Sequence, residues 1–213
     1  FTAFGISLDE SRRRFTEGLA QVRLLLEQEN VSSQGEFHSF SNVTSLPRPT
    51  QKPRPPFWIA ATTTPETFEF AGKNGCKLMG IPLEPEKMRN LLGIYRDAWR
   101  SAGHPGNGEV MNTFFMTCMP TREEAMAVGL GPCNGHLRGL AVSAKEWLGG
   151  ASTKDYPGYD KLIAHVTSDT AESQVAKGSA FIGTPKDIIE MIRSFNDKVG
   201  GLDSISLHFA PSN

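Results

Sequence analysis

The sequence predicts an α/β fold in which a parallel sheet lies between layers of helices. Apolar strand segments alternate with segments of helical periodicity along the 213-residue chain, at 57–62, 76–81, 109–120 and 204–209. The strand segments are separated by helices rather than by two-residue turns, and most are apolar on both faces, which indicates βα units. Such units can close into a barrel or remain an open doubly wound sheet. Four strands fit either form.

Helix boundaries follow from capping residues and apolar spacing. Ser7 and Glu10 match the capping-box pattern at the start of a helix expected over residues 8–28. A helix over 65–74 ends at the sequence 73–75, Lys-Asn-Gly, which offers a cation for the helix terminus and a glycine for a left-handed exit. Further helices are expected from Pro85 to Ala102, after the Thr121-x-x-Glu124 capping box, and from Pro185 to about Phe195.

Two segments interrupt this alternation. Residues 30–56 are polar and end in PRPTQKPRPP, whose prolines forbid regular helix, so we expect this connector to run extended over the surface. Residues 149–180 are long, polar and contain glycine, with Tyr156 and Tyr159 close together. That stretch fits a mobile lid over a barrel mouth, or a solvated insertion. The chain length favours a single domain over residues 1–213.

Composition argues against several classes of protein. A net charge of −1 and a pI of 6.6 lack the basic character of a nucleic-acid-binding protein. No apolar run approaches the roughly 20 residues that span a bilayer, and no signal segment opens the chain, so we expect no membrane partner and a cytoplasmic location. Cys76, Cys118 and Cys133 are an odd number without metal-ligand spacing, which suggests neither a disulfide framework nor a metal site.

The strongest candidate site lies in residues 57–75, FWIAATTTPETFEFAGKNG. Thr64 followed by Pro65 makes a favourable helix start, with a hydroxyl at the N-cap and proline at the first helical position. Because this helix follows directly from a strand, its free N–H groups lie at the edge where ligands bind in α/β folds. Hydroxyls of Thr63, Thr64 and Thr67 would add hydrogen-bond donors there. A phosphate group is the natural ligand.

Simple helix capping is the alternative explanation for these threonines. Thr184-Pro185 with Asp187 repeats the pattern near the other end of the chain. That turn is a second possible anion site, with fewer hydroxyls around it. The chain contains no GxGxxG sequence and no Walker A loop, which weakens the case for dinucleotides and nucleoside triphosphates.

Three stretches are informative in their order along the chain: ESRRRFTEGLAQVRLLL, VSSQGEFHSFSNVTSLPRPTQKPRPPFWIAATTTPETFEFAGKNG and IGTPKDIIEMI. Together they resemble the luciferase-like flavin-dependent monooxygenases, the family of bacterial luciferase and of the flavin-dependent alkane and alkanesulfonate oxygenases. The resemblance implies a partial TIM-like (β/α) barrel that lacks its N-terminal strands, so we expect this chain to be an incomplete C-terminal segment. The absent strands would hold the usual catalytic candidates, and the catalytic residues therefore stay unknown.

The resemblance also implies a cofactor and a site. In this family the turn after the fifth strand receives the flavin phosphate, and residue-by-residue matching places Thr63, Thr64 and Thr67 around it, with Ala61 near the ring end. Bacterial luciferase has an acid where Thr63 stands here. The implied cofactor is reduced FMN, supplied by a flavin reductase, which uses O₂ to oxygenate a small organic substrate such as an aldehyde, an alkane or a sulfonate. The open edges of a half-barrel further suggest a homodimer.

Other functions are compatible with the same pattern. One is a non-catalytic flavin-binding protein, another an oxidoreductase that uses the deazaflavin F420, and a third a sugar-phosphate enzyme with a TIM barrel. Among the histidines, His208 in the closing strand is the one that could face a substrate, although packing in the core is the more common role of such a residue. The other histidines lie in loops or amphipathic stretches and are weaker candidates: His38, His104, His136 and His165.

Overall fold

The structure, a computed structural model, describes residues 4–5, 7–148, 164 and 168–209. The chain forms two compact units. The hairpin unit contains residues 1–56 and 146–157, and the sheet unit contains residues 57–145 and 158–213. The prediction that residues 1–213 form a single domain stays a prediction.

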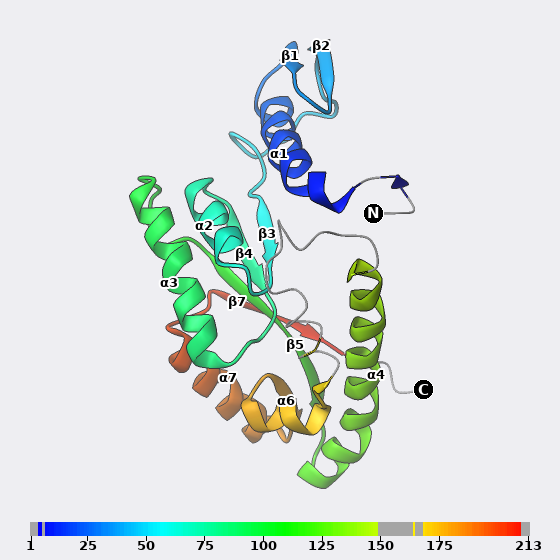
Figure 1. Ribbon diagram of the computed structural model, residues 1–213. Coiled ribbons are helices and arrows are strands. Elements are labelled where there is room, and N and C mark those ends of the chain that lie inside the picture. The colour runs from blue at the N-terminus through cyan, green and yellow to red at the C-terminus, as the bar shows by residue number, and fades with distance from the viewer. Residues whose placement is uncertain (1–3, 6, 149–163, 165–167, 210–213) are drawn as a thin grey trace. The chain divides into compact units, whose positions relative to one another are not determined.

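The hairpin unit begins with a 3-10 turn and a long helix, followed by an antiparallel hairpin (Figure 1). Its elements are η2 (Leu8–Glu10), α1 (Ser11–Glu27), β1 (Val31–Gln34) and β2 (Ser39–Val43). The prediction of an extended connector over residues 30–56 is thus wrong for its first half, in which β1 and β2 pair with each other. The pairing was missed because the two strands are short, mostly polar and lack apolar alternation. Residues 44–56 form neither helix nor strand, as their prolines predict.

The capping box predicted from Ser7 and Glu10 does not form. The N-cap of α1 is Glu10 itself, which makes no side-chain capping hydrogen bond. Its carboxylate instead accepts hydrogen bonds from Arg14 Nε and Nη2, at 3.1 and 3.0 Å. The Ser7 hydroxyl accepts from the N–H of Asp9 at 3.3 Å. Helix α1 therefore starts later than predicted. The Glu10 carboxylate, which the capping box requires, instead forms an ion pair with Arg14, one turn further along the helix.

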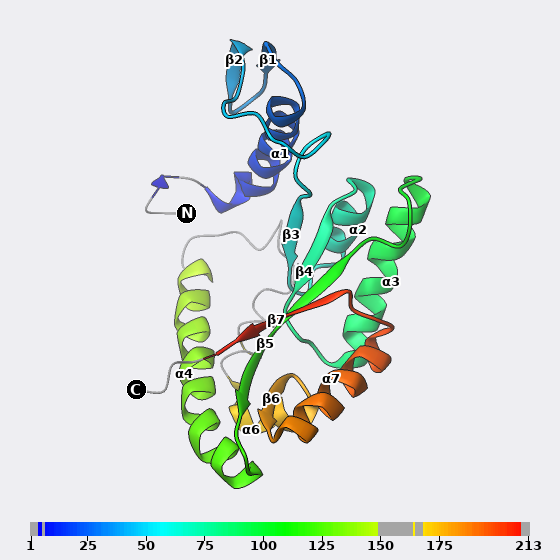
Figure 2. The same ribbon diagram turned by 180° about the vertical axis from the view of Figure 1, so that it is seen from behind.

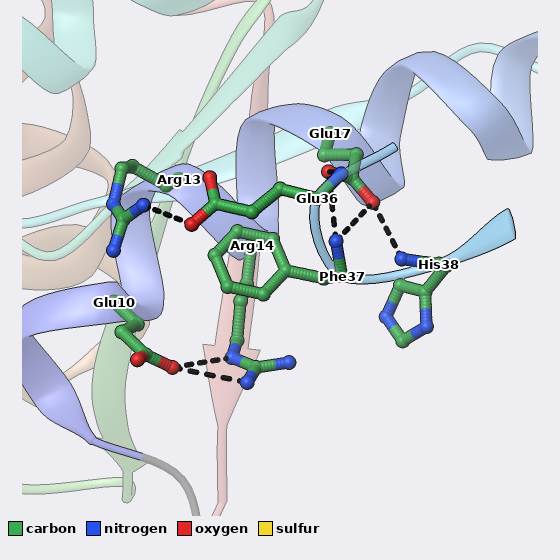
Figure 3. Close-up of polar contacts among 7 residues, drawn as sticks. All are labelled: Glu10, Arg13, Arg14, Glu17, Glu36, Phe37 and His38. Carbon is green, nitrogen blue, oxygen red and sulfur yellow. Dashed lines mark hydrogen bonds and ion pairs between the residues drawn. The ribbon is translucent and has the colours of Figure 1, made fainter. Parts of the chain in front are cut away.

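A single carboxylate on α1 holds the turn of the hairpin (Figure 3). Glu17 accepts hydrogen bonds from three consecutive backbone N–H groups, those of Glu36 at 2.7 Å, Phe37 at 3.1 Å and His38 at 2.8 Å. A Cβ atom at Gly35 would collide with this carboxylate, so a larger residue there would displace Glu17 from the turn. Desolvation raises the pKa of Glu17, but the hydrogen bonds from His38, Phe37 and Glu36 together outweigh it and lower the pKa below its ordinary value.

Arginines fasten both ends of α1 to the rest of the hairpin unit. Near its start, the guanidinium of Arg14 lies 4.2 Å from the centre of the Phe37 ring, a cation–π contact (Figure 3). At its end, Arg48 donates to the carbonyl oxygens of Leu25 and Leu26, at 2.7 and 3.0 Å. The proline-rich segment thereby satisfies carbonyl groups that a helix C-terminus leaves open.

In the described residues of the sheet unit, five strands pair in parallel and five helices accompany them. The strands are β3 (Trp58–Ala61), β4 (Lys77–Gly80), β5 (Val110–Cys118), β6 (Ala180–Gly183) and β7 (Ser204–His208). The helices are α2 (Pro65–Lys73), α3 (Pro85–Ser101), α4 (Arg122–Leu148), α6 (Ala171–Lys177) and α7 (Pro185–Val199). The α/β class and the four predicted strands are confirmed, and β6 is an additional strand.

Strand β5 is the longest and organises the sheet. Three of its residues, Met111, Asn112 and Phe115, each pair with two other strands, so these partners lie on opposite sides of β5. The registers include Gly80↔Asn112↔Ile205 and Ala180↔Phe115↔His208. Consequently β4 and β6 lie along one edge of β5, one after the other, and β7 lies along the other edge. The order β3–β4–β5–β7, with helices between successive strands, is that of a partial TIM-like barrel.

Helices cover the two faces of this sheet unequally. Helices α2, α3 and α7 lie on one side and α4 on the other (Figures 1 and 2). On the first side, Phe114 stacks on Phe181 with ring centroids 4.3 Å apart and meets Phe195 of α7 edge-on at 4.9 Å. On the second, Phe115 joins Ala125 and Cys133 of α4 in a buried cluster. On the same face, Ala60 of β3 is exposed and Met79 of β4 and Met111 of β5 are half-buried.

Residues 149–163 and 165–167 of the lid predicted over 149–180 lie outside the described residues. The last part of that segment, 171–180, contains α6 and the first residue of β6. Ala171 and Val175 of α6 are buried in the same cluster as Phe115. These ten residues therefore belong to the packed core of the sheet unit. In the described part of the chain, no helix has the length and apolar character that crossing a membrane requires.

Candidate functional site

The threonine turn, residues 62–67, joins the C-terminal end of β3 to α2. Thr64 has extended backbone torsions, φ −86° and ψ 109°, and is the N-cap of α2, with Pro65 as the first helical residue. Its side chain is only 8% exposed, whereas Thr63 and Thr67 are half-buried. The turn thus places three hydroxyl groups around the N-terminus of a nine-residue helix.

Thr64 does not act as a capping residue. Its side chain makes no capping hydrogen bond, and the N–H of Thr67 donates instead to the backbone carbonyl of Thr64 at 3.0 Å. At the start of α7 the capping box is complete: the Thr184 hydroxyl accepts from the N–H of Asp187 at 3.3 Å, and the Asp187 carboxylate accepts from the N–H of Thr184 at 3.0 Å. Simple capping therefore explains Thr184 but does not explain Thr64.

The second possible anion site, at Thr184, is filled by the protein's own acid. Hydrogen bonds from the backbone and side chain of Thr184 lower the pKa of Asp187, so this carboxylate is held in its charged form at the N-terminus of α7. In α2 the only acid of the first turn is Glu66, which is exposed. Of the two turns, only the one at Thr64 has no side-chain carboxylate bound at its N-cap, so the N-terminus of α2 can accept an anionic ligand.

The threonine turn has the chemistry that a phosphate group requires. Helix N-termini carry partial positive charge and free N–H groups, and both favour anions. The Thr64 hydroxyl makes no capping hydrogen bond, and a hydroxyl group can donate to an anion at this position. The residues present therefore fit the phosphate of a flavin.

Ala61, matched by the resemblance to the ring end of a flavin, is the last residue of β3 and is 4% exposed. Its side chain lies on the same face as Ile59, because alternate residues of a strand share a face. The side chain on the opposite, open face is that of Ala60. A contact with a flavin at position 61 would therefore involve the backbone.

The open face continues across the sheet from Ala60. The strand registers place Met79 of β4, Met111 of β5 and Ser204 of β7 beside one another on it, followed by Thr113. These four side chains are exposed or half-buried. This face is the one that lines the interior of a closed barrel, and sequence periodicity did not identify it, because the strands are apolar on both sides.

Two histidines and a phenylalanine meet at the far end of this face. His208 ends β7 and pairs with Phe115, and their ring centroids lie 5.8 Å apart. His136 of α4 meets His208 edge-on, with centroids 4.9 Å apart and an interplanar angle of 89°. Desolvation, and then the charge on His208, lower the pKa of His136. The sequence suggested His208 as a candidate, but nothing in it indicated that His136 would be its partner.

Other features of the described residues do not add to this site. Cys118 is exposed, while Cys76 and Cys133 are buried, and burial raises the pKa of Cys133 to about 11. No group of three or more potential metal ligands occurs in the described ranges. A cleft of about 310 Å³ lies beside α6 and α7, lined among others by Lys177, Asp187 and Lys198. It includes neither the threonines nor the histidines.

Comparisons with known proteins agree with this fold. A family model described as luciferase-like monooxygenase matches residues 1–201. The oxygenase component of a flavin-dependent trigonelline monooxygenase from Acinetobacter baylyi is 42% identical over 66 residues, which are 30% of this chain and 18% of that protein.

Two solved structures resemble the chain over nearly its whole length. The crystal structure of the monooxygenase RslO1 from Streptomyces bottropensis is 31% identical with a TM-score of 0.74, over 98% of this chain and 57% of that one. An F420-dependent secondary alcohol dehydrogenase, solved with an F420–acetone adduct, is 16% identical with a TM-score of 0.65, over 96% and 58% of the two chains. The second likeness shows the fold alone.

The chain thus spans little more than half the length of these solved relatives. Its family model nevertheless covers nearly the entire sequence and includes the threonine turn and His136, while His208 lies beyond the end of the match. On this evidence the chain belongs to the luciferase-like monooxygenase family.

Proposed function

We propose that this chain provides the phosphate-binding part of the FMN site of a flavin-dependent monooxygenase. The observation that supports the proposal is the position of Thr64, a buried residue at a helix N-cap whose side chain makes no capping hydrogen bond. The hydroxyls of Thr63, Thr64 and Thr67 would hold the phosphate, together with the N–H of Glu66. Pro65 has no N–H, and that of Thr67 donates to the carbonyl of Thr64. The backbone at Ala61 would approach the ring end.

The remaining residues would orient the cofactor and exclude water. When bound, reduced FMN supplies the electrons with which one atom of O₂ enters an organic substrate. The side chains of Met79 and Met111 on the open face provide an apolar surface beside the bound ring system. A flavin reductase would deliver the reduced cofactor, and the substrate would be a small organic molecule. Two copies of the protein would form a homodimer.

FMN is favoured over F420 by the relatives. The trigonelline monooxygenase, 42% identical where it matches, is named as flavin-dependent, and the 31% identical RslO1 is a monooxygenase. The F420-dependent dehydrogenase is 16% identical. Titration of the full-length protein with FMN and with F420, followed by cofactor fluorescence, separates the two. A non-catalytic flavin-binding protein would bind FMN but would oxygenate neither a long-chain aldehyde nor a ketone in the presence of reduced FMN and O₂.

The site is tested by replacing one hydroxyl with a methyl group. We expect Thr64→Val to weaken FMN binding about ten- to a hundredfold, since a hydrogen bond to a charged group contributes roughly 1.5–3 kcal/mol. Thr64→Ser, which keeps the hydroxyl, should restore most of the affinity. Dissociation constants come from quenching of flavin fluorescence in the full-length protein.

Thr184→Val is the matched control, because Thr184 occupies the same Thr-Pro context and caps its helix. It should lower the free energy of unfolding by about 0.5–2 kcal/mol and leave FMN affinity unchanged. Thr64→Val should show the reverse, with lost affinity and nearly unchanged stability. Equal FMN affinity in wild type and Thr64→Val would contradict the proposed site.

A further inference from the structure

The histidine pair, His136 and His208, lies at the same edge of the sheet as the threonine turn. Ala61, Gly80, Asn112 and Ile205 stand level with one another across the four strands. Thr64 follows the first of these by three residues, and His208 follows the last by three. Thr64 lies beyond the end of β3 and His208 is the last residue of β7, so both lie towards the carboxyl ends of the parallel strands, where ligands bind in α/β folds.

The distance between the two places suits one extended ligand. Strands β3 and β7 are separated by β4 and β5, three strand spacings or about 14 Å at ~4.8 Å each. FMN carries its phosphate at one end of a sugar-alcohol chain and its fused rings at the other. A phosphate held at Thr64 thus leaves the ring system to extend across β4 and β5 towards β7.

The end of β7 offers polar groups on an apolar base. Phe115, 8% exposed, contacts the ring of the exposed residue His208, and α4 brings the ring of His136, also exposed, against that of His208. Each imidazole can donate and accept hydrogen bonds. In the described part of the chain, no carboxylate forms a hydrogen bond or ion pair with either imidazole, so neither ring is neutralised by an acid.

We propose that His208 contacts the ring end of the bound flavin and exchanges protons there, and that His136 is a positioning residue that fixes the orientation of the His208 ring. This inference rests on the proposed FMN site. The neutral form of His136, favoured by its lowered pKa, is consistent with such a supporting role at neutral pH.

The location is tested by NMR of the imidazole groups in the full-length protein, with oxidised FMN as the probe. Signals are assigned with His208→Gln and His136→Gln. On titration with FMN, the His208 signals should shift strongly and those of His136 less. The control is His104, whose ring contacts Trp99 at 5.0 Å and whose Nε2 lies 3.1 Å from the carbonyl of Lys73 at the end of α2. Its signals should stay in place.

The role is tested by the pH dependence of the oxidation of bound reduced FMN by O₂. His208→Gln should remove a pH-dependent inflection in this rate that wild type and His104→Gln retain, while its FMN dissociation constant stays within about twofold of wild type, since no phosphate contact is lost. His136→Gln should move the inflection without removing it. In His208→Gln, the pKa of His136 should rise towards its ordinary value.

The possible failures are distinguishable. If FMN binds but the His208 signals do not shift, or if the pH profile of His208→Gln equals that of wild type, this inference is wrong and the threonine site stands. If FMN fails to bind wild type, the proposed function fails and this inference falls with it. If Thr64→Val loses affinity while the histidine signals stay constant at saturating FMN, the ring end lies elsewhere.

Discussion

Thr64 and Thr184 both precede a proline at a helix start, yet only Thr184 has its hydroxyl bonded within the turn. The difference lies three residues further along. The Asp187 carboxylate accepts a hydrogen bond from the N–H of Thr184, the N-cap of α7. The corresponding residue in α2 is Thr67, whose side chain is uncharged. The Thr-Pro spacing predicted similar turns at both helix starts. The third helical residue, Thr67 in α2 and Asp187 in α7, is the sequence signal that distinguishes the uncapped turn from the capped one.

Glu17 should make the hairpin turn sensitive to acid. Because its pKa is lowered in the folded state, the stabilisation is present above the ordinary value of 4.5 and is lost as the pH falls through the lower folded-state value. Glu17→Gln should reduce amide protection at Glu36, Phe37 and His38 at neutral pH, as measured by hydrogen exchange. Acidification should bring the wild type down to the level of the variant.

Glu29→Gln serves as the control for that measurement. Glu29 is exposed and lies just beyond α1 in the same unit. Its replacement should leave protection of the turn unchanged at every pH. Protection in Glu17→Gln equal to that of wild type at neutral pH would show that the carboxylate does not hold the turn.

Gly80 and Asn112 should be coupled in stability. Asn112 is fully buried, neither polar atom of its side chain has a hydrogen-bond partner, and a Cβ at Gly80 would lie 2.7 Å from its Oδ1. Gly80→Ala alone should lower the free energy of unfolding by about 1–3 kcal/mol through overpacking. The same change in an Asn112→Ala background should cost much less, and chemical denaturation of all four proteins measures the coupling. Additive costs would exclude the contact.

At the scale of elements, α2 and α3 pack closely through one glycine. A Cβ at Gly72 would lie 2.8 Å from Cβ of Ala98 and 2.9 Å from the backbone nitrogen of Trp99. The backbone of α3 cannot yield as a side chain can, so Gly72→Ala should destabilise the protein by about 1–3 kcal/mol in thermal unfolding. Gly93→Ala on α3, where the added Cβ meets no atom within 4 Å, should instead stabilise it by about 0.5–1 kcal/mol. Similar effects at both positions would refute this packing.

Elements with strong local signals were predictable from the sequence. The helices at α2, α3 and α7 begin at prolines and end within a few residues of their predicted limits, and Thr121 with Glu124 forms the expected capping box before α4. The strand β6 and the hairpin were missed. The four residues of β6 are buried throughout and follow a helix closely, and the hairpin is polar, so neither has the periodicity that identifies a strand.

For the whole molecule, strand alternation predicted parallel βα units, and the resemblance to a family predicted a partial barrel. Neither source placed His136 beside His208, because that pairing depends on the path of α4 across the sheet. The open face across β3, β4, β5 and β7 likewise emerges only from strand register. The threonine turn is local in the sequence and could be predicted from it. The histidine pair and the open face combine residues of separate elements and could not.

The central claim is that the threonine turn binds the phosphate of FMN, and comparison with riboflavin, which lacks that phosphate, tests it most directly. Dissociation constants of both flavins are measured for full-length wild type and Thr64→Val by fluorescence quenching. Wild type should bind FMN at least about tenfold more tightly than riboflavin, and the variant should lose most of that preference, because phosphate and hydroxyl contribute through one shared contact. A preference for FMN that is equally large in Thr64→Val would place the phosphate elsewhere.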